Sequence, residues 1–117
     1  ERLRAALKSR VRQPVSVLFV DFDLMQQINE RYGHQAGDAV LAGSATRLLS
    51  ALGQRALVCR HGGEEFAILL EQTSLREAAR LGEQVRHEFS KLPFEHRGQE
   101  IPVTVSVGAA TDRQRPP

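Results

Sequence analysis

Cysteine, tryptophan and long apolar runs are scarce or absent in this sequence of 117 residues. Because Cys59 is its one cysteine, no disulfide can form within these residues, and we expect a reducing, cytoplasmic setting. No apolar run approaches the roughly 20 residues of a membrane span, and no segment looks like a signal peptide. The length and composition predict one ordinary globular domain with a core of its own.

A clustered basic surface is also missing from the sequence. The formal net charge is +2, yet the arginines are spread along the chain, without the stripe of basic and aromatic residues that nucleic-acid binders present. The sequence therefore predicts no nucleic-acid partner and no membrane contact by this domain, and it leaves phosphorylated small ligands open as a class.

A pair of glycines separates the apolar residues 56–59 from the apolar residues 66–70. This pattern predicts a β-hairpin whose turn has a positive φ. Glu64 and Glu65 follow the glycines directly, and neighbouring carboxylates repel each other unless a cation lies between them. One interpretation is a metal or cationic ligand at the hairpin tip; the other is a surface turn with two solvated acids.

A nearly continuous apolar run over residues 15–20 predicts a central strand that is buried on both faces. Asp21 and Asp23 follow this run and project to the same side if the strand persists. They would then lie at the carboxyl end of a strand, which is where α/β sheets place their binding sites.

The remaining periodicities predict helices on both sides of the hairpin and a final strand. Residues 1–11 have helical spacing but no N-cap signal, so we expect the natural protein to extend further N-terminally. A capping box at Ser74 starts a later helix, with Leu75 and Leu92 at the two ends of its buried stripe. The other expected elements are helices over 24–32 and 38–52, a turn or small hairpin over 94–99, and a half-buried strand over 101–107, with no periodic signal over 111–117.

This order of elements predicts an α/β (α+β) fold of the ferredoxin-like or polymerase-palm type, with an antiparallel central sheet flanked by helices. The first strand would lie beside the hairpin and bring Asp21 and Asp23 within metal-bridging distance of the two glutamates. Three or four carboxylates converging on one point, without thiolates or paired imidazoles, favour Mg²⁺ or Mn²⁺.

The sequence resembles the GGDEF domain, the diguanylate cyclase family, in its Gly-Gly-Glu-Glu-Phe variant at residues 62–66. The further matching blocks are Asp21-Phe22-Asp23, Ile28-Asn29, Gly33-His34, Gly37-Asp38 and Val105-Ser106-Val107-Gly108. The resemblance covers essentially all of residues 1–117 as a single domain. From the resemblance we expect a domain that is incomplete at the N-terminus and lacks the C-terminal helix and strand of the family.

The resemblance implies a nucleotidyl-cyclase-like fold and a nucleotidyltransferase activity that condenses two GTP molecules into cyclic di-GMP and two pyrophosphates. In the family's arrangement, Asp21, the backbone carbonyl of Phe22 and Glu64 would hold Mg²⁺ or Mn²⁺. Glu65 would be a further ligand or a charge-organising group, and Asp23 would lie nearby. The catalytic residues implied are Asp21, Glu64 and Glu65.

Guanine recognition would fall to Asn29 and Asp38, since a carboxylate accepts from the guanine N1 and N2 donors and an amide both donates and accepts. Taken without the resemblance, Asp38 is an acidic charge near a helix start, which the helix dipole favours. Backbone N–H groups after the first strand would cradle phosphates, and the glycine pair would let the hairpin approach the nucleotide. The substrate-binding residues implied are Asn29, Asp38, Phe22, Asp23, Leu24, Met25, Gly62 and Gly63.

One domain of this family binds one GTP, so the resemblance implies a homodimer in which two copies face each other, with an upstream sensor or regulatory domain controlling their approach. Gln26 departs from the family, which usually has a lysine there that neutralises phosphate charge. An alternative is therefore a catalytically degenerate module that binds GTP or a protein partner and regulates a neighbouring domain.

Overall fold

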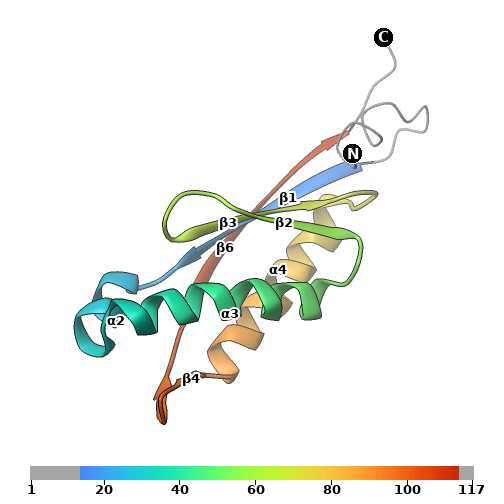
Figure 1. The fold of residues 1–117 in the computed structure, drawn as a ribbon. Coiled ribbons are helices and arrows are strands. Elements are labelled where there is room, and N and C mark those ends of the chain that lie inside the picture. Colours follow the sequence, from blue (N-terminus) through green and yellow to red (C-terminus); the bar gives the residue numbers. More distant parts are fainter. Residues whose placement is uncertain (1–13, 114–117) are drawn as a thin grey trace.

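The computed structural model describes residues 14–113, which form a four-stranded antiparallel sheet, three helices and a separate two-stranded hairpin (Figure 1). The strands are β1 (Pro14–Phe22), β2 (Ala56–Arg60), β3 (Glu65–Leu70), β4 (Phe94–His96), β5 (Gln99–Ile101) and β6 (Val105–Arg113). The helices are α2 (Met25–Tyr32), α3 (His34–Leu52) and α4 (Leu75–Lys91). The helix expected over residues 1–11 lies outside the described residues.

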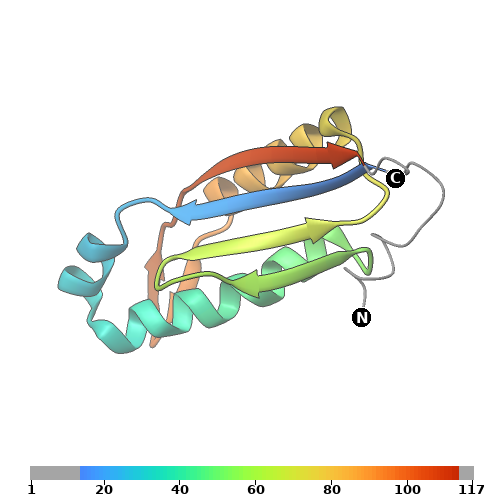
Figure 2. The ribbon, with the colours of Figure 1, turned by 90° about the horizontal axis from the view of Figure 1, so that it is seen from above.

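The four long strands lie side by side in the order β2-β3-β1-β6, and every neighbouring pair is antiparallel (Figure 2). Strand β1 therefore lies between the hairpin strand β3 and the final strand β6. This is the ferredoxin-like, palm-type order predicted from the sequence. It confirms that the first strand lies next to the hairpin.

Helices α3 and α4 cover one face of this sheet (Figures 1 and 2). Leu18 and Val20 of β1 point to that face and are fully buried, whereas Phe19, between them, is 42% exposed. The prediction that β1 is buried on both faces is therefore wrong. The apolar run suggested burial on both faces because Val17 and Phe19 are apolar too. These two residues, however, lie on the face of β1 that is less covered.

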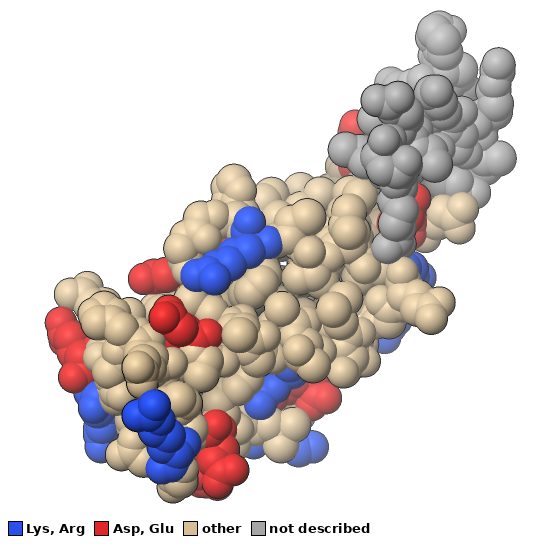
Figure 3. All heavy atoms as spheres, in the orientation of Figure 1, with Lys and Arg blue, Asp and Glu red and all other residues tan. Residues whose placement is uncertain are grey.

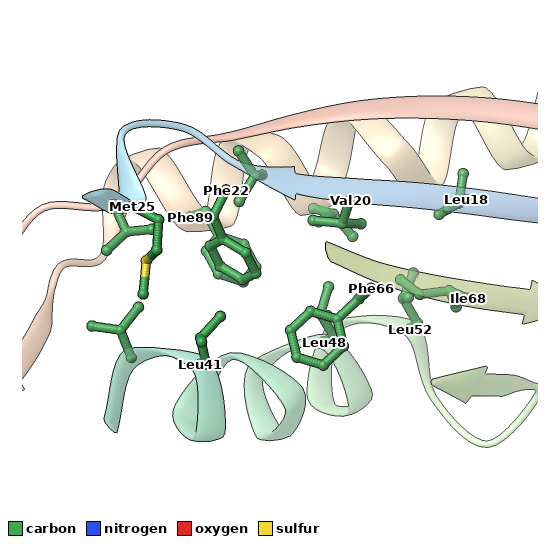
Figure 4. Packing of buried hydrophobic residues seen from close by; sticks show 14 of the residues in the cluster. Leu18, Val20, Phe22, Met25, Leu41, Leu48, Leu52, Phe66, Ile68 and Phe89 are labelled. Carbon is green, nitrogen blue, oxygen red and sulfur yellow. The ribbon is translucent and has the colours of Figure 1, made fainter. Parts of the chain in front are cut away.

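The core lies between the sheet and the two long helices, and the labelled side chains of β1, β3, α3 and α4 meet there (Figure 4). Phe22 at the end of β1 contacts Phe66 of β3 edge to face, with ring centroids 5.8 Å apart. Its other edge-to-face contact is with Phe89 of α4, at 5.9 Å. These contacts fix the end of β1 against the hairpin and against α4, so residues around Phe22 are held on a packed support.

Helix α4 begins after Ser74, as the sequence predicted, and one half of the expected capping box is present, since the N-cap hydroxyl of Ser74 accepts from the Glu77 N–H at 3.1 Å. The Glu77 carboxylate binds the Arg55 guanidinium at 2.6 Å, and this hydrogen bond lowers the pKa of Glu77. Leu75 and Leu92 are 53% and 49% exposed, so their assignment to the buried stripe was wrong. Both lie at the ends of the helix, beyond the residues that face the sheet.

The other elements confirm the predicted types but shift several boundaries. Helix α2 ends at Gly33 as predicted, and α3 begins at His34, four residues before the predicted start at 38. The small hairpin extends to Ile101, and the final strand β6 then runs from Val105 to Arg113, through residues without a periodic signal. Pairing of β6 along the whole of β1 explains this extension. None of the helices between residues 14 and 113 is both long and apolar enough to cross a membrane.

Candidate active site

The end of β1 meets the tip of the β2–β3 hairpin. Asp21 lies directly opposite Glu65 in the β1–β3 register, so both side chains project from the same face of the sheet. The next residue, Phe22, donates its N–H to the carbonyl oxygen of Glu64 at 3.2 Å. The structure thus brings Asp21, Glu64 and Glu65 to one edge of the sheet, as the sequence predicted.

The hairpin turn is shaped by its own backbone. Gly62 has a φ of 76°, a conformation that favours glycine, which confirms the predicted positive φ. The Arg60 guanidinium donates to the Gly63 carbonyl at 3.0 Å, and the His61 N–H donates to the Glu65 carbonyl at 2.7 Å. A Cβ at Gly62 or Gly63 would meet no atom within 4 Å, so open space lies beside the turn for a ligand.

The oxygen donors at this edge suit a hard divalent cation. Within residues 14–112, neither Asp21 nor Glu64 has an ion-pair partner. The expected convergence of three or four carboxylates is not found, because no group of three or more His, Cys, Asp or Glu side chains in the described part of the chain is placed to hold a metal. The oxygen donors at this edge include the carboxylates of Asp21 and Glu64 and the carbonyl of Phe22, and oxygen donors are the kind that Mg²⁺ and Mn²⁺ prefer.

The carboxylate of Asp23 is bound by other residues of the chain, which is one reason why it does not join Asp21 and the glutamates as a candidate metal ligand. Its two carboxylate oxygens accept hydrogen bonds from the Thr104 hydroxyl at 2.9 Å and the Ser106 hydroxyl at 2.8 Å. Its N–H also donates to the Thr104 carbonyl at 3.0 Å. Asp23 therefore ties the turn after β1 to β6. Sequence reasoning missed this role of Thr104 and Ser106, although both stood out as polar residues alternating with valines.

The turn from β1 into α2 offers fewer phosphate donors than expected. The N–H groups of Phe22 and Asp23 are already bound to Glu64 and Thr104, so the implied role of these two N–H groups in phosphate binding is corrected. No acceptor is found for the N–H groups of Leu24 and Met25 within the described chain. Leu24 has φ 61° and ψ 31°, a left-handed conformation that is unusual for leucine and often found at functional turns.

The two predicted guanine-binding residues are neighbours across the junction of α2 and α3. Asn29 of α2 is half-buried and lies against the α3 backbone at Gly37, the residue before Asp38. Asp38 itself is exposed, and its carboxylate has no hydrogen bond or ion pair within residues 14–112. Both side chains therefore keep polar atoms available for a ligand.

A cavity of about 300 Å³ lies between α2 and the segment before β6. It is lined by two of the expected substrate-binding residues, Asp23 and Leu24, and by Gln27 and Tyr32 among others, but by none of the residues expected to read guanine. Acidic and basic side chains are interspersed over the face shown in Figure 3, and the part of it that is described carries no continuous basic surface.

The model of the family described as "Diguanylate cyclase, GGDEF domain" matches residues 1–116 of this chain. The response regulator PleD of Caulobacter vibrioides is 40% identical over 99 residues, which cover 83% of this chain and 22% of PleD. A diguanylate cyclase of Vibrio cholerae is 36% identical over 108 residues, which cover 92% of this chain and 34% of that protein.

Solved structures of such domains have the same fold. Diguanylate cyclase SiaD of Pseudomonas aeruginosa, in complex with its activator SiaC, superposes with a TM-score of 0.84 and 36% identity over 97% of this chain and 44% of that one. The active GGEEF domain of a diguanylate cyclase from Vibrio cholerae gives a TM-score of 0.76 and 34% identity over 94% of this chain and 64% of that one. The chain thus spans 22% and 34% of the length of the two curated relatives above.

The family match covers almost the whole chain, and the signature residues lie together at one edge of the palm-type sheet. The chain therefore belongs to the GGDEF domain family of diguanylate cyclases.

Proposed function

We propose that this domain condenses two GTP molecules into cyclic di-GMP and two pyrophosphates by metal-assisted phosphoryl transfer across a homodimer. The observation that carries the proposal is the pairing of the end of β1 with the β2–β3 hairpin. There Asp21 lies opposite Glu65, and the Phe22 N–H donates to the carbonyl oxygen of Glu64. Asp21 and Glu65 lie on paired strands and Glu64 lies in the turn before β3, and within residues 14–112 the ion pair at these three acids is between His61 and Glu65, at 3.8 Å. A cation bound at this edge would be attracted by these neighbouring carboxylates.

The carboxylates of Asp21 and Glu64 and the carbonyl of Phe22 would hold Mg²⁺ or Mn²⁺. The ion would supply activation of the 3′-hydroxyl and neutralisation of the leaving pyrophosphate. Glu65 faces Asp21 across the strand pair and would orient the attacking hydroxyl, which must displace pyrophosphate from the α-phosphorus of the other GTP.

Substrate binding would use two surfaces on either side of α2. The free N–H groups of Leu24 and Met25 at its start would bind phosphate oxygens, as helix N-termini commonly do. Asn29 on the same helix and Asp38 on α3 would bind the guanine edge. With one GTP bound per domain, the reaction would need a second copy of the domain, and an upstream sensor or regulatory domain would set how often the two sites meet.

A second candidate is a degenerate module that binds GTP or a protein partner without turnover. It is favoured by Gln26, which donates to Glu30 at 3.3 Å on the exposed side of α2 and places no positive charge beside the proposed phosphate site. An amide forms weaker hydrogen bonds with phosphate than a cation does.

The test between these candidates is an assay of the full-length protein with GTP and Mg²⁺, in which cyclic di-GMP and pyrophosphate are quantified together. A catalytic domain produces them in a ratio of about 1:2, as two-step condensation by phosphoryl transfer requires. GTP binding without either product assigns the domain to the degenerate class, and the absence of GTP binding rejects both nucleotide-binding proposals.

Replacing Gln26 with lysine is expected to raise kcat/KM for GTP about 10-fold, because a charge-assisted hydrogen bond to phosphate replaces a neutral one. Steady-state rates at several GTP concentrations measure the change. Gln27→Lys is the matched control, since it adds the same charge one position later on an exposed residue of the same helix. An equal gain in both variants would contradict a specific phosphate contact at position 26 and indicate general attraction of GTP.

A further inference from the structure

The backbone of α3 passes unusually close to the side chain of Asn29. A Cβ atom built on Gly37 would lie 1.8 Å from Asn29 Oδ1 and 3.0 Å from Asn29 Cγ. The next nearest atom is Met25 Cε at 3.5 Å, which is an ordinary van der Waals contact. Of the atoms near this position, those of the Asn29 amide are therefore the ones that a side chain at position 37 would displace.

Backbone conformation does not explain this glycine. Gly37 is a buried residue within α3, and it is absent from the positive-φ residues of the described chain. Glycine inside a helix weakens it relative to alanine, because glycine loses more backbone freedom on folding. A glycine that is unfavourable for its own helix is explained here by the close approach of α3 to Asn29.

We propose that Gly37 is a positioning residue for guanine recognition: it lets α3 pack directly on the Asn29 amide and so sets the spacing between Asn29 and Asp38. The inference rests on the proposed function, in which these two side chains bind one base. Asn29 has no side-chain hydrogen bond within the described chain, so packing against Gly37 restrains it while its donor and acceptor stay available.

A Cβ at position 37 would displace this amide. Cβ atoms essentially never lie within 3.0 Å of another heavy atom, so Asn29 Oδ1 would have to move by more than 1 Å. A shift of about 1 Å in a positioned group can cost about 100-fold in activity. The loss should fall on recognition of the base and not on binding of the phosphates.

The experiment measures affinities of the full-length Gly37→Ala variant for GTP, ATP and inorganic tripolyphosphate. We expect GTP affinity to fall by about 10-fold to 100-fold, with ATP and tripolyphosphate affinities within about 2-fold of the wild type. The preference for GTP over ATP therefore falls at least about 5-fold. A general structural defect would instead weaken binding of all three ligands together.

Gly43→Ala is the matched control, since it makes the same change in the same helix. Its Cβ would meet Phe94 Cε1 at 2.9 Å, a core contact that involves neither Asn29 nor Asp38. We expect this variant to lose thermal stability and keep the wild-type preference for GTP over ATP.

The pair Gly37→Ala and Asn29→Ala tests whether Gly37 acts through Asn29. Once the amide is removed, the new Cβ has no close neighbour, so Gly37→Ala should change GTP affinity by less than about 2-fold in the Asn29→Ala background. Additive losses overturn the inference, as does a Gly37→Ala protein with wild-type preference for GTP. If the wild type itself binds no GTP, the proposed function fails first and the inference falls with it.

Discussion

Replacing Glu64 with glutamine is expected to reduce cyclic di-GMP synthesis at least about 100-fold. Glutamine preserves the size of the side chain but removes its negative charge, so one of the two carboxylates that would hold the divalent cation is lost. Metal-assisted stabilisation of a phosphoryl-transfer transition state contributes several kcal/mol, and each loss of about 1.4 kcal/mol lowers the rate 10-fold. Rates of pyrophosphate release at saturating GTP and several Mg²⁺ concentrations measure the effect.

A higher requirement for Mg²⁺ in the Glu64→Gln protein would identify the lost interaction as metal binding. Glu95→Gln is the matched control, because it makes the same change at an exposed position of the small β4–β5 hairpin, outside the proposed site. We expect this control to keep wild-type rates. Wild-type activity of the Glu64→Gln protein would show that Glu64 neither binds the cation nor takes part in the reaction.

Replacing Phe89 with alanine is expected to lower the free energy of unfolding by about 3–5 kcal/mol. The Phe89 side chain is 1% exposed and packs against Phe22 and Phe94, with ring centroids 5.9 and 6.0 Å away. The Arg47 guanidinium lies 5.2 Å from its ring centroid. Alanine would leave a cavity between α4 and the end of β1, and urea unfolding followed by circular dichroism measures the loss.

Leu75→Ala in the same helix serves as the control for Phe89→Ala. Leu75 is 53% exposed, so its truncation should change the free energy of unfolding by no more than about 0.5 kcal/mol. Alanine is the replacement in both variants and both positions lie in α4. The difference between their losses in free energy of unfolding therefore reports mainly the loss of buried contacts. Similar stabilities would contradict the assignment of Phe89 to the core. Because unfolded protein is inactive, Phe89→Ala should also lower activity in proportion to the unfolded fraction.

Local sequence patterns identified most elements of this fold. The glycine pair and its flanking apolar residues predicted the β2–β3 hairpin, and the Ser74 capping box predicted the start of α4. These predictions succeeded because turn chemistry and capping act over a few residues. The end of β6 was missed because Gly108 and the small residues after it show no alternation, and its pairing with β1 is a long-range interaction.

For the candidate site too, the sequence predicted some features and missed others. The sequence indicated the acidic residues of the candidate site, Asp21 and the two glutamates after the glycine pair. Carboxylates at the end of a strand and at a hairpin tip suggest a bound cation or ligand. Their arrangement was only partly predictable. The sequence suggested that Asp23 would join the acidic cluster, but its carboxylate is bound by two hydroxyls from the β6 side of the sheet.

The sequence by itself determined the order of elements, the oxygen-rich chemistry of the site and the family to which the domain belongs, since these depend on local periodicity and short motifs. The tertiary structure decided which face of β1 is covered, which carboxylate stays free and how closely α3 approaches Asn29. Strand register and helix packing join residues far apart in the chain. Their side chains come into contact only when burial of the shared core fixes the distances between the elements.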